Sequence, residues 1–280
     1  MKFGAHVSTA APFSEAVIRA KDIGCECMQI FVNAPQRWNP VAIPEAEIEN
    51  FVEKNKKENI KPIVIHSIYL INLASGNPFF YEASIKSLID DMQKAKKIGA
   101  LGVNFHVGST KGKPFDEVVD KVVLACRNVL SAVPEGPQLI LENSAGAGDI
   151  IGDKFAELGA IIKKVNSDRV KVCLDTAHAF GSGYNLATTE GLDTTMEEFD
   201  KEIGIENLVC LHLNDSAVPW GSQRDRHADI GQGYIGLKGF DNIINHHTLK
   251  DLPGIIETPG NKGKSDIDNL KILRSLEKRT

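Results

Sequence analysis

The chain has 280 residues, of which 42% are hydrophobic and 25% charged, and this composition excludes collagen-like, low-complexity and disordered proteins. No apolar run approaches the roughly 18–20 residues of a membrane span, and residues 1–17 lack the apolar core of a signal peptide, so we expect a cytoplasmic protein without membrane contact. The formal net charge of −5 argues mildly against nucleic acid as a ligand.

Eight short apolar segments recur along the chain, each followed by a loop and an amphipathic stretch. In chain order they are KFGAHV (2–7), CECMQIF (25–31), KPIVIH (61–66), ALGVNFH (100–106), PQLILEN (137–143), VKVCLD (170–175), NLVCLHL (207–213) and PGIIET (253–258). Residues 81–98, 114–131 and 265–277 have the apolar spacing of helices. Eight strand–helix units with continuous apolar strands favour a closed (β/α)8 TIM barrel, formed as a single domain over 1–280.

Two connections, 176–192 and 213–236, are unusually long. Long loops in a compact domain usually have a function, so we expect both to contribute to the site. The segment GQGYIG (231–236) matches a dinucleotide-binding pattern in letters only, because it follows no early strand. We interpret it as a turn within the second of these connections.

Six of the apolar segments end in an ionisable residue at the same place in the unit. These residues are His66, His106, Glu142, Asp175, His212 and Glu257. A barrel brings all carboxyl ends of its strands to one face, where active sites of this fold lie. Buried carboxylates would repel one another, so a cation is expected among them. His6 ends the first segment in the same way, and for this residue alone a structural and a functional role remain equally open.

The long connections add three more potential metal ligands, namely His178, Asp225 and His227. Five histidines and four carboxylates are enough for two or three ions, particularly if one carboxylate bridges. The five cysteines form no CxxC pair, which excludes a zinc ribbon. Histidine and carboxylate ligands without thiolate are typical of zinc, manganese or iron.

The chain resembles endonuclease IV, the barrel-fold apurinic/apyrimidinic (AP) endonuclease of base-excision repair. The resemblance covers essentially the whole chain. Its motifs are GAHVS (4–8), HSIYLINLA (66–74), NFHVGS (104–109), LENSAGAG (141–148), CLDTAHAFGSGY (173–184), LHLNDS (211–216), GSQRDRHADIGQGYIG (221–236) and IIETPG (255–260).

This resemblance implies three zinc ions per chain, and manganese could replace zinc at one or more positions. His66, His106 and Glu142 would hold the first ion. Glu142 would bridge to the second, which Asp175, His212 and Glu257 complete, and His178, Asp225 and His227 would hold the third. The family flips the AP site out of the duplex, which assigns DNA contacts to Tyr69, Leu70 and Arg37.

The implied reaction is hydrolysis of the phosphodiester 5′ to an abasic site in double-stranded DNA. A metal-bound hydroxide would attack the phosphorus, oriented by Glu142 as the catalytic residue, and leave a 3′-hydroxyl and a 5′-deoxyribose phosphate. Trimming of 3′ ends is also expected, as is a monomeric enzyme. The sequence departs from the family at Arg37, which directly precedes Trp38 where the family has its arginine one residue earlier, and at Ala217, which replaces a common lysine.

Two other functions stay open from the sequence. A sugar isomerase or epimerase on a similar barrel needs only one or two metals, and leaves His178, Asp225 and His227 unexplained. A catalytically silent DNA-lesion binder would not need a complete set of ligands. Metal stoichiometry and turnover on an abasic duplex distinguish these alternatives.

Overall fold

The computed structural model describes residues 1–259 and 265–278, and its centre is a closed barrel of parallel strands. Around the ring, the order is β1-β10-β7-β6-β5-β4-β3-β2, so the first and last strands pair and close the barrel. The strands are β1 (Lys2–Val7), β2 (Cys27–Phe31), β3 (Ile63–His66), β4 (Gly102–His106), β5 (Gln138–Glu142), β6 (Val170–Asp175), β7 (Leu208–His212) and β10 (Pro253–Ile256). The TIM-barrel prediction is therefore confirmed.

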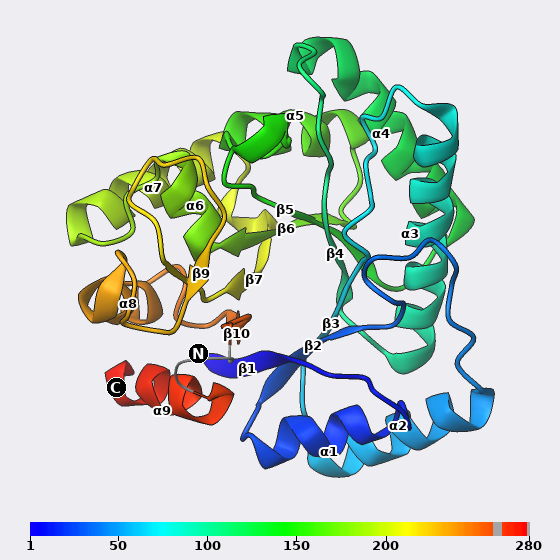
Figure 1. Cartoon of the computed structure of the whole chain (residues 1–280), viewed down its shortest axis with the longest axis horizontal. Coiled ribbons are helices and arrows are strands. Elements are labelled where there is room, and N and C mark those ends of the chain that lie inside the picture. Colours follow the sequence, from blue (N-terminus) through cyan, green and yellow to red (C-terminus); the bar gives the residue numbers. More distant parts are fainter. Residues whose placement is uncertain (260–264, 279–280) are drawn as a thin grey trace.

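Helices surround the barrel on its outside (Figure 1). They are α1 (Glu15–Asp22), α2 (Glu45–Glu58), α3 (Pro78–Ile98), α4 (Phe115–Ala132), α5 (Phe155–Val165), α6 (Thr176–Ser182), α7 (Thr189–Glu202), α8 (Gly236–Asn245) and α9 (Asp266–Leu276), with short 3-10 turns η1 (Ala147–Asp149) and η2 (Ile205–Asn207). Their ends follow local chemistry: the Asn77 side chain caps α3 by accepting from the Phe79 N–H, and Gly99 ends it with a φ of 67°. Within the described residues, no helix is long and apolar enough to cross a membrane.

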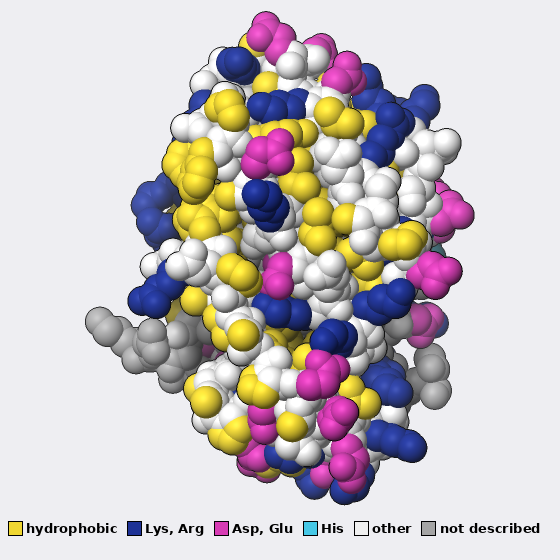
Figure 2. Space-filling view, turned by 90° about the vertical axis from the view of Figure 1, so that its right-hand side faces the viewer, with side chains coloured by type: hydrophobic (Ala, Val, Ile, Leu, Met, Phe, Trp, Pro, Cys, Tyr) yellow, Lys and Arg dark blue, Asp and Glu magenta, His cyan; other side chains and the backbone are white. Residues whose placement is uncertain are grey.

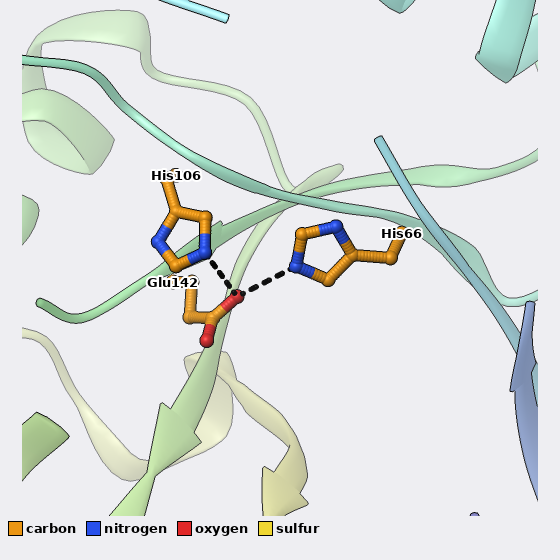
Figure 3. A group of neighbouring side chains, drawn as sticks. All are labelled: His66, His106 and Glu142. Atoms are coloured by element: carbon orange, nitrogen blue, oxygen red, sulfur yellow. Dashed lines mark ion pairs between the residues drawn. The ribbon is translucent and has the colours of Figure 1, made fainter. Parts of the chain in front are cut away.

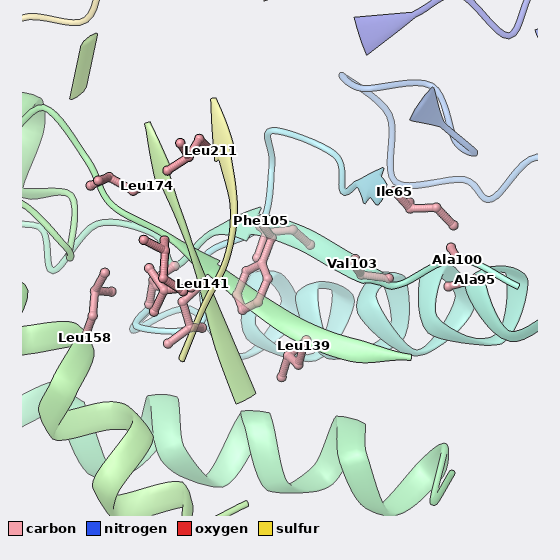
Figure 4. Packing of buried hydrophobic residues seen from close by; sticks show 14 of the residues in the cluster. Ile65, Ala95, Ala100, Val103, Phe105, Leu139, Leu141, Leu158, Leu174 and Leu211 are labelled. Atoms are coloured by element: carbon pink, nitrogen blue, oxygen red, sulfur yellow. The ribbon is translucent and has the colours of Figure 1, made fainter. Parts of the chain in front are cut away.

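The pleat of the strands separates two apolar layers. One set of side chains points outward and packs against the helices, as Figure 4 shows for Val103 and Phe105 of β4 and for Leu139 and Leu141 of β5. A smaller set fills the inside of the barrel and consists of Cys27, Val64, Ile140, Cys173, Cys210 and Ile255. Successive side chains alternate between the two faces of a strand, so the residue two positions after each inner residue also points inward. Five of these six positions are the predicted ligands at the strand ends.

The two long connections have structure of their own. The first, 176–192, contains α6 and the start of α7. The Asp175 carboxylate caps the N-terminus of α6 by accepting from the His178 N–H at 2.8 Å. The second contains a two-stranded antiparallel pair, β8 (Asp215–Ser216) and β9 (His227–Ala228). Residues 231–235 form the predicted turn, and Gly236 begins α8. The last residue of the IIETPG motif, Gly260, lies outside the described residues.

Candidate metal centre

The carboxyl ends of the strands bring the predicted ionisable side chains to one mouth of the barrel. His106 is level with Glu142 in the β4–β5 register, and Asp175 is level with His212 in the β6–β7 register. The side chains of predicted ligands on neighbouring strands therefore leave the backbone at the same level of the barrel. Ligand atoms of these residues form three groups, in each of which all atoms lie within 4.8 Å of one another.

The first group contains His66, His106 and Glu142 (Figure 3). Oε2 of Glu142 lies 3.3 Å from Nε2 of His66 and 3.8 Å from Nε2 of His106. The Nδ1–H of His66 donates to the Ser67 carbonyl at 2.7 Å, which leaves Nε2 facing Glu142. The imidazole is therefore held with its free nitrogen toward the other two ligands, the arrangement expected of a metal-binding histidine.

The second group contains Glu142, Asp175, His212 and Glu257. Nδ1 of His212 lies 3.1 Å from Oε1 of Glu142, 3.3 Å from Oε2 of Glu257 and 3.7 Å from Oδ2 of Asp175. Three carboxylates thus converge on a single nitrogen. Glu142 belongs to this group through one oxygen and to the first group through the other, which is the placement that a bridging carboxylate requires.

The third group contains Asp175, His178 and His227 and lies at the rim, where Asp225 of the long 213–236 connection adjoins both histidines. Nε2 of His178 and Nε2 of His227 are each 3.3 Å from an oxygen of Asp225. Asp175 therefore belongs to both the second and the third group. The side chain of Asp225 is 51% exposed, whereas that of His178 is only 4% exposed. This group is therefore the one most open to solvent.

Asp215 fixes the connection that carries His227. Its buried carboxylate accepts hydrogen bonds from the backbone N–H groups of Gly231, Gly233 and Ile235 at 2.9–3.0 Å. Its neighbour Ser216 pairs with His227 in the β8–β9 ladder. A loop ligand is thus held by sheet hydrogen bonds and by a buried acid rather than by the barrel itself.

Mutual attraction shifts the pKa values of the buried carboxylates and of His212 in opposite directions. Burial alone would raise the pKa of Glu142, but the charges of His106 and His212 hold it well below its ordinary value. Burial alone would lower the pKa of His212, but Glu257 and Glu142 raise it well above the usual range. Burial opposes ionisation of Asp225 too, yet its hydrogen bond with His178 lowers its pKa to about 2. The carboxylates therefore require positive charge at this mouth.

The residues present suit divalent cations. Nine nitrogen and oxygen ligands converge, and the five cysteines are buried elsewhere and free. Nε2 of His227 is buried and has no hydrogen-bond partner among the described residues, while its Nδ1–H donates to the Glu257 carbonyl. A histidine nitrogen left without a hydrogen-bond partner beside two carboxylates is suited to bind a metal. This donor set favours zinc, manganese or iron over a thiolate-bound metal.

Of the residues predicted to contact DNA, Tyr69 lies at the metal groups. The residue is 54% exposed, its ring centroid lies 5.5 Å from that of His66, and burial with the nearby carboxylates raises its pKa to about 12. Its N–H donates to the carbonyl of Pro35, which joins it to the exposed loop of Arg37. Leu70 is half-buried and packs against the hydrophobic core, and its contact with DNA stays a prediction.

Several amide side chains that hold the ligands were not identified from the sequence. Asn104 donates to Oε2 of Glu142 at 2.5 Å, Asn214 donates to Oδ2 of Asp175 at 2.7 Å, and Asn143 accepts from the Asp175 N–H at 2.6 Å. Gln29 is fully buried and contacts Glu257 and His212. A polar residue inside an otherwise apolar strand is the signal that would have revealed Gln29 and Asn104.

Three comparisons relate the chain to known proteins. A family model described as xylose isomerase-like TIM barrel matches residues 17–276. Probable endonuclease 4 of Halothermothrix orenii is 44% identical over 98% of this chain and 99% of its own length, and that of Aquifex aeolicus is 38% identical over 98% and 97%. The crystal structure of endonuclease IV from Thermus thermophilus superposes with a TM-score of 0.88 at 34% identity, covering 99% of this chain and 98% of that one.

Proposed function

We propose that this chain, which belongs to the endonuclease IV family, is a DNA-repair endonuclease that hydrolyses the phosphodiester 5′ to abasic sites in double-stranded DNA. The products would be a 3′-hydroxyl and a 5′-deoxyribose phosphate, and the enzyme would also trim blocked 3′ ends. The whole chain, residues 1–280, would act as a single catalytic domain and as a monomer.

One observation carries this proposal: Glu142 has one oxygen in each of two adjacent ligand groups, and a third group lies beside them. Phosphodiester hydrolysis needs charge stabilisation at the attacking, the phosphoryl and the leaving oxygens, which three neighbouring cations satisfy. The residues that would hold the zinc ions are His66, His106 and Glu142, then Glu142, Asp175, His212 and Glu257, then His178, Asp225 and His227. Zinc at these positions supplies Lewis acidity, which acidifies water and neutralises charge on the reacting oxygens.

The side chains around these ligands fix the direction in which each ligand presents its donor atom. Asn104 holds Oε2 of Glu142, so the carboxylate cannot rotate away from its position between the two groups. Asn214 holds Oδ2 of Asp175 while the His178 N–H holds Oδ1. Ligands held in this way need little reorganisation during the reaction, which is the main source of electrostatic catalysis.

The charge of the protein is compatible with DNA once the cations are counted. Three divalent ions add six positive charges, which changes the formal net charge from −5 to about +1 and concentrates the positive charge at the mouth. On the side of the molecule that carries α3, Lys and Arg are interspersed with Asp and Glu (Figure 2). We therefore assign DNA binding to the mouth, where the exposed Lys111, Lys113, Arg224 and Arg226 would contact backbone phosphates.

At this mouth, Tyr69 would stack on the flipped nucleotide or on its neighbour. Its exposed ring lies against His66 and Phe31, so an abasic sugar held there would be next to the first ligand group. Flipping costs a few kcal/mol, and least for a nucleotide without a paired base, which favours abasic sites over intact DNA.

The test is incubation of the purified protein with a duplex that contains one abasic site and carries labels on both ends. We expect one incision, 5′ to the site, that a chelator abolishes and added zinc restores. Elemental analysis should give three ions per chain, mostly zinc. A sugar isomerase or epimerase would carry one or two ions and leave the duplex intact, whereas a silent lesion binder would hold the duplex without cutting it.

A further inference from the structure

Gln29 occupies an unusual position for an uncharged polar residue. It lies in β2, its side chain is fully buried, and it points into the barrel at the level of the ligands, because Cys27 two residues earlier belongs to the inner layer. In the β1–β2 register it pairs with His6. A buried amide must have its hydrogen bonds satisfied, and the partners of Gln29 are three residues of the mouth.

These partners determine which way the amide is turned. Nε2 of Gln29 lies 2.7 Å from Oε1 of Glu257, and its oxygen lies 2.9 Å from Nε2 of His212. An ionised carboxylate only accepts, so the amide nitrogen must face Glu257. The amide oxygen then faces His212, and Nε2 of His212 must carry the hydrogen.

The position of that hydrogen decides which nitrogen of His212 is available to a metal. With Nε2 protonated, the neutral imidazole has its lone pair on Nδ1. Nδ1 is the nitrogen that lies within 3.1–3.7 Å of Glu142, Glu257 and Asp175. The opposite tautomer would place the lone pair of Nε2 against the oxygen of Gln29, which is repulsive. The amide therefore selects the tautomer that binds a cation.

The same amide also holds Glu257. Its hydrogen bond to Oε1 leaves Oε2 directed at Nδ1 of His212. Its nitrogen also lies 3.1 Å from Nδ1 of His6. A single side chain thus connects two ligands of the second group to His6, a residue that contacts Glu257 at 3.3 Å.

From this geometry we propose that Gln29 is a positioning residue for the second ion of the site: it fixes His212 as an Nδ1 ligand and orients Glu257. This inference rests on the proposed function, since it assumes that the second group binds a metal. Residues that orient ligands from outside the coordination sphere typically contribute 10–100-fold to metal affinity.

The test compares zinc binding by the wild type, Gln29→Met and the matched control Gln138→Met. Gln138 begins β5 at the opposite end of the barrel, so its substitution is chemically identical but remote from the ligands. Competition with a chromogenic chelator measures each dissociation constant in the absence of DNA. We expect about a 10–100-fold loss of affinity for one of three ions in Gln29→Met and no change in Gln138→Met.

A second measurement needs no variant. Histidine ¹⁵N spectra of the zinc-loaded wild type should show the proton of His212 on Nε2, and a proton on Nδ1 instead would overturn the proposal even if Gln29→Met failed to fold. Equal zinc affinities for the wild type and a folded Gln29→Met would also overturn it, and would leave the proposed nuclease function standing. Failure of the proposed function itself appears differently, as a wild type that binds fewer than three ions and leaves the abasic duplex intact.

Discussion

Asp91 is a buried acid whose protonation should be visible in the stability of the protein. It lies on α3 with 1% of its surface exposed, and it accepts hydrogen bonds from the Ser67 hydroxyl at 2.6 Å and from the Asn33 amide at 2.7 Å. Burial raises its pKa to about 7, only partly opposed by those hydrogen bonds. The carbonyl of the same Ser67 accepts from His66 and orients its imidazole, so Asp91 is connected to the first ligand group through Ser67.

The raised pKa sets the sign and size of the effect. Between its unfolded value of 3.8 and its folded value of about 7, the native state holds a proton that the unfolded chain has lost. The contribution of Asp91 to the free energy of unfolding is therefore fully present below pH 3.8, and it is lost as the pH rises through about 7. Each pH unit in this window lowers the free energy of unfolding by about 1.4 kcal/mol, which gives a loss of about 2.5 kcal/mol between roughly pH 5 and pH 8.

The substitution Asp91→Asn keeps the shape of the side chain and removes the titration. Urea unfolding of the zinc-loaded wild type and variant at several pH values measures the difference between their free energies of unfolding. We expect that difference to shift by about 2.5 kcal/mol in favour of the variant across this range. The control is Asp90→Asn, since Asp90 is partly exposed and pairs with Lys94 at 2.7 Å. Parallel pH profiles for the wild type and Asp91→Asn would refute the reasoning.

The remaining predictions concern the site. Glu142→Gln should slow single-turnover cleavage of an abasic duplex by about 100-fold or more while affinity for the duplex changes little, since positioning is lost but phosphate contacts remain; cleavage within a few-fold of the wild type with full metal content would remove Glu142 as the bridge. Tyr69→Ala should weaken binding to abasic duplex by about 1–3 kcal/mol in filter-binding assays, with normal metal content, because it loses one stacking surface. Asp225→Asn should retain two zinc ions instead of three after mild chelation, because its 51% exposed side chain belongs to the most open group; three ions would contradict this.

The sequence was sufficient to predict the ligands that end the strands. In a barrel, the side-chain alternation and the parallel direction of the strands determine where such residues point, so His66, His106 and Glu142 could be placed together from the sequence alone. The clustering of Asp175 and His212 follows from the same rule, since the register places them level. The roles of these residues as ligands stay predictions until the metals are measured.

Other features could not be predicted, because they depend on distances across the barrel. Gln29 and His212 are 183 positions apart, and no local pattern connects an amide in β2 with an imidazole in β7. The sequence predicted a loop where the structure has α6. Asp175 caps this helix, but the sequence had indicated Asp175 only as a metal ligand, so its capping role was missed. Burial also differs between neighbours: Tyr69 is exposed, whereas Leu70 packs partly against the core, and the sequence does not show this difference.

The nine predicted ligands differ in origin, and this difference bears on how the site would function. His66, Glu142, Asp175 and His212 lie at strand ends and are at most 2% exposed, so the rigid barrel fixes the first two groups. Asp225 and His227 come from the 213–236 connection, whose position depends on the β8–β9 pair and on Asp215. A change in this connection would alter the third group and leave the other two intact. Since a metal pair is all that an isomerase on a similar barrel requires, the connection that carries Asp225 and His227 would distinguish the proposed phosphodiesterase from an isomerase.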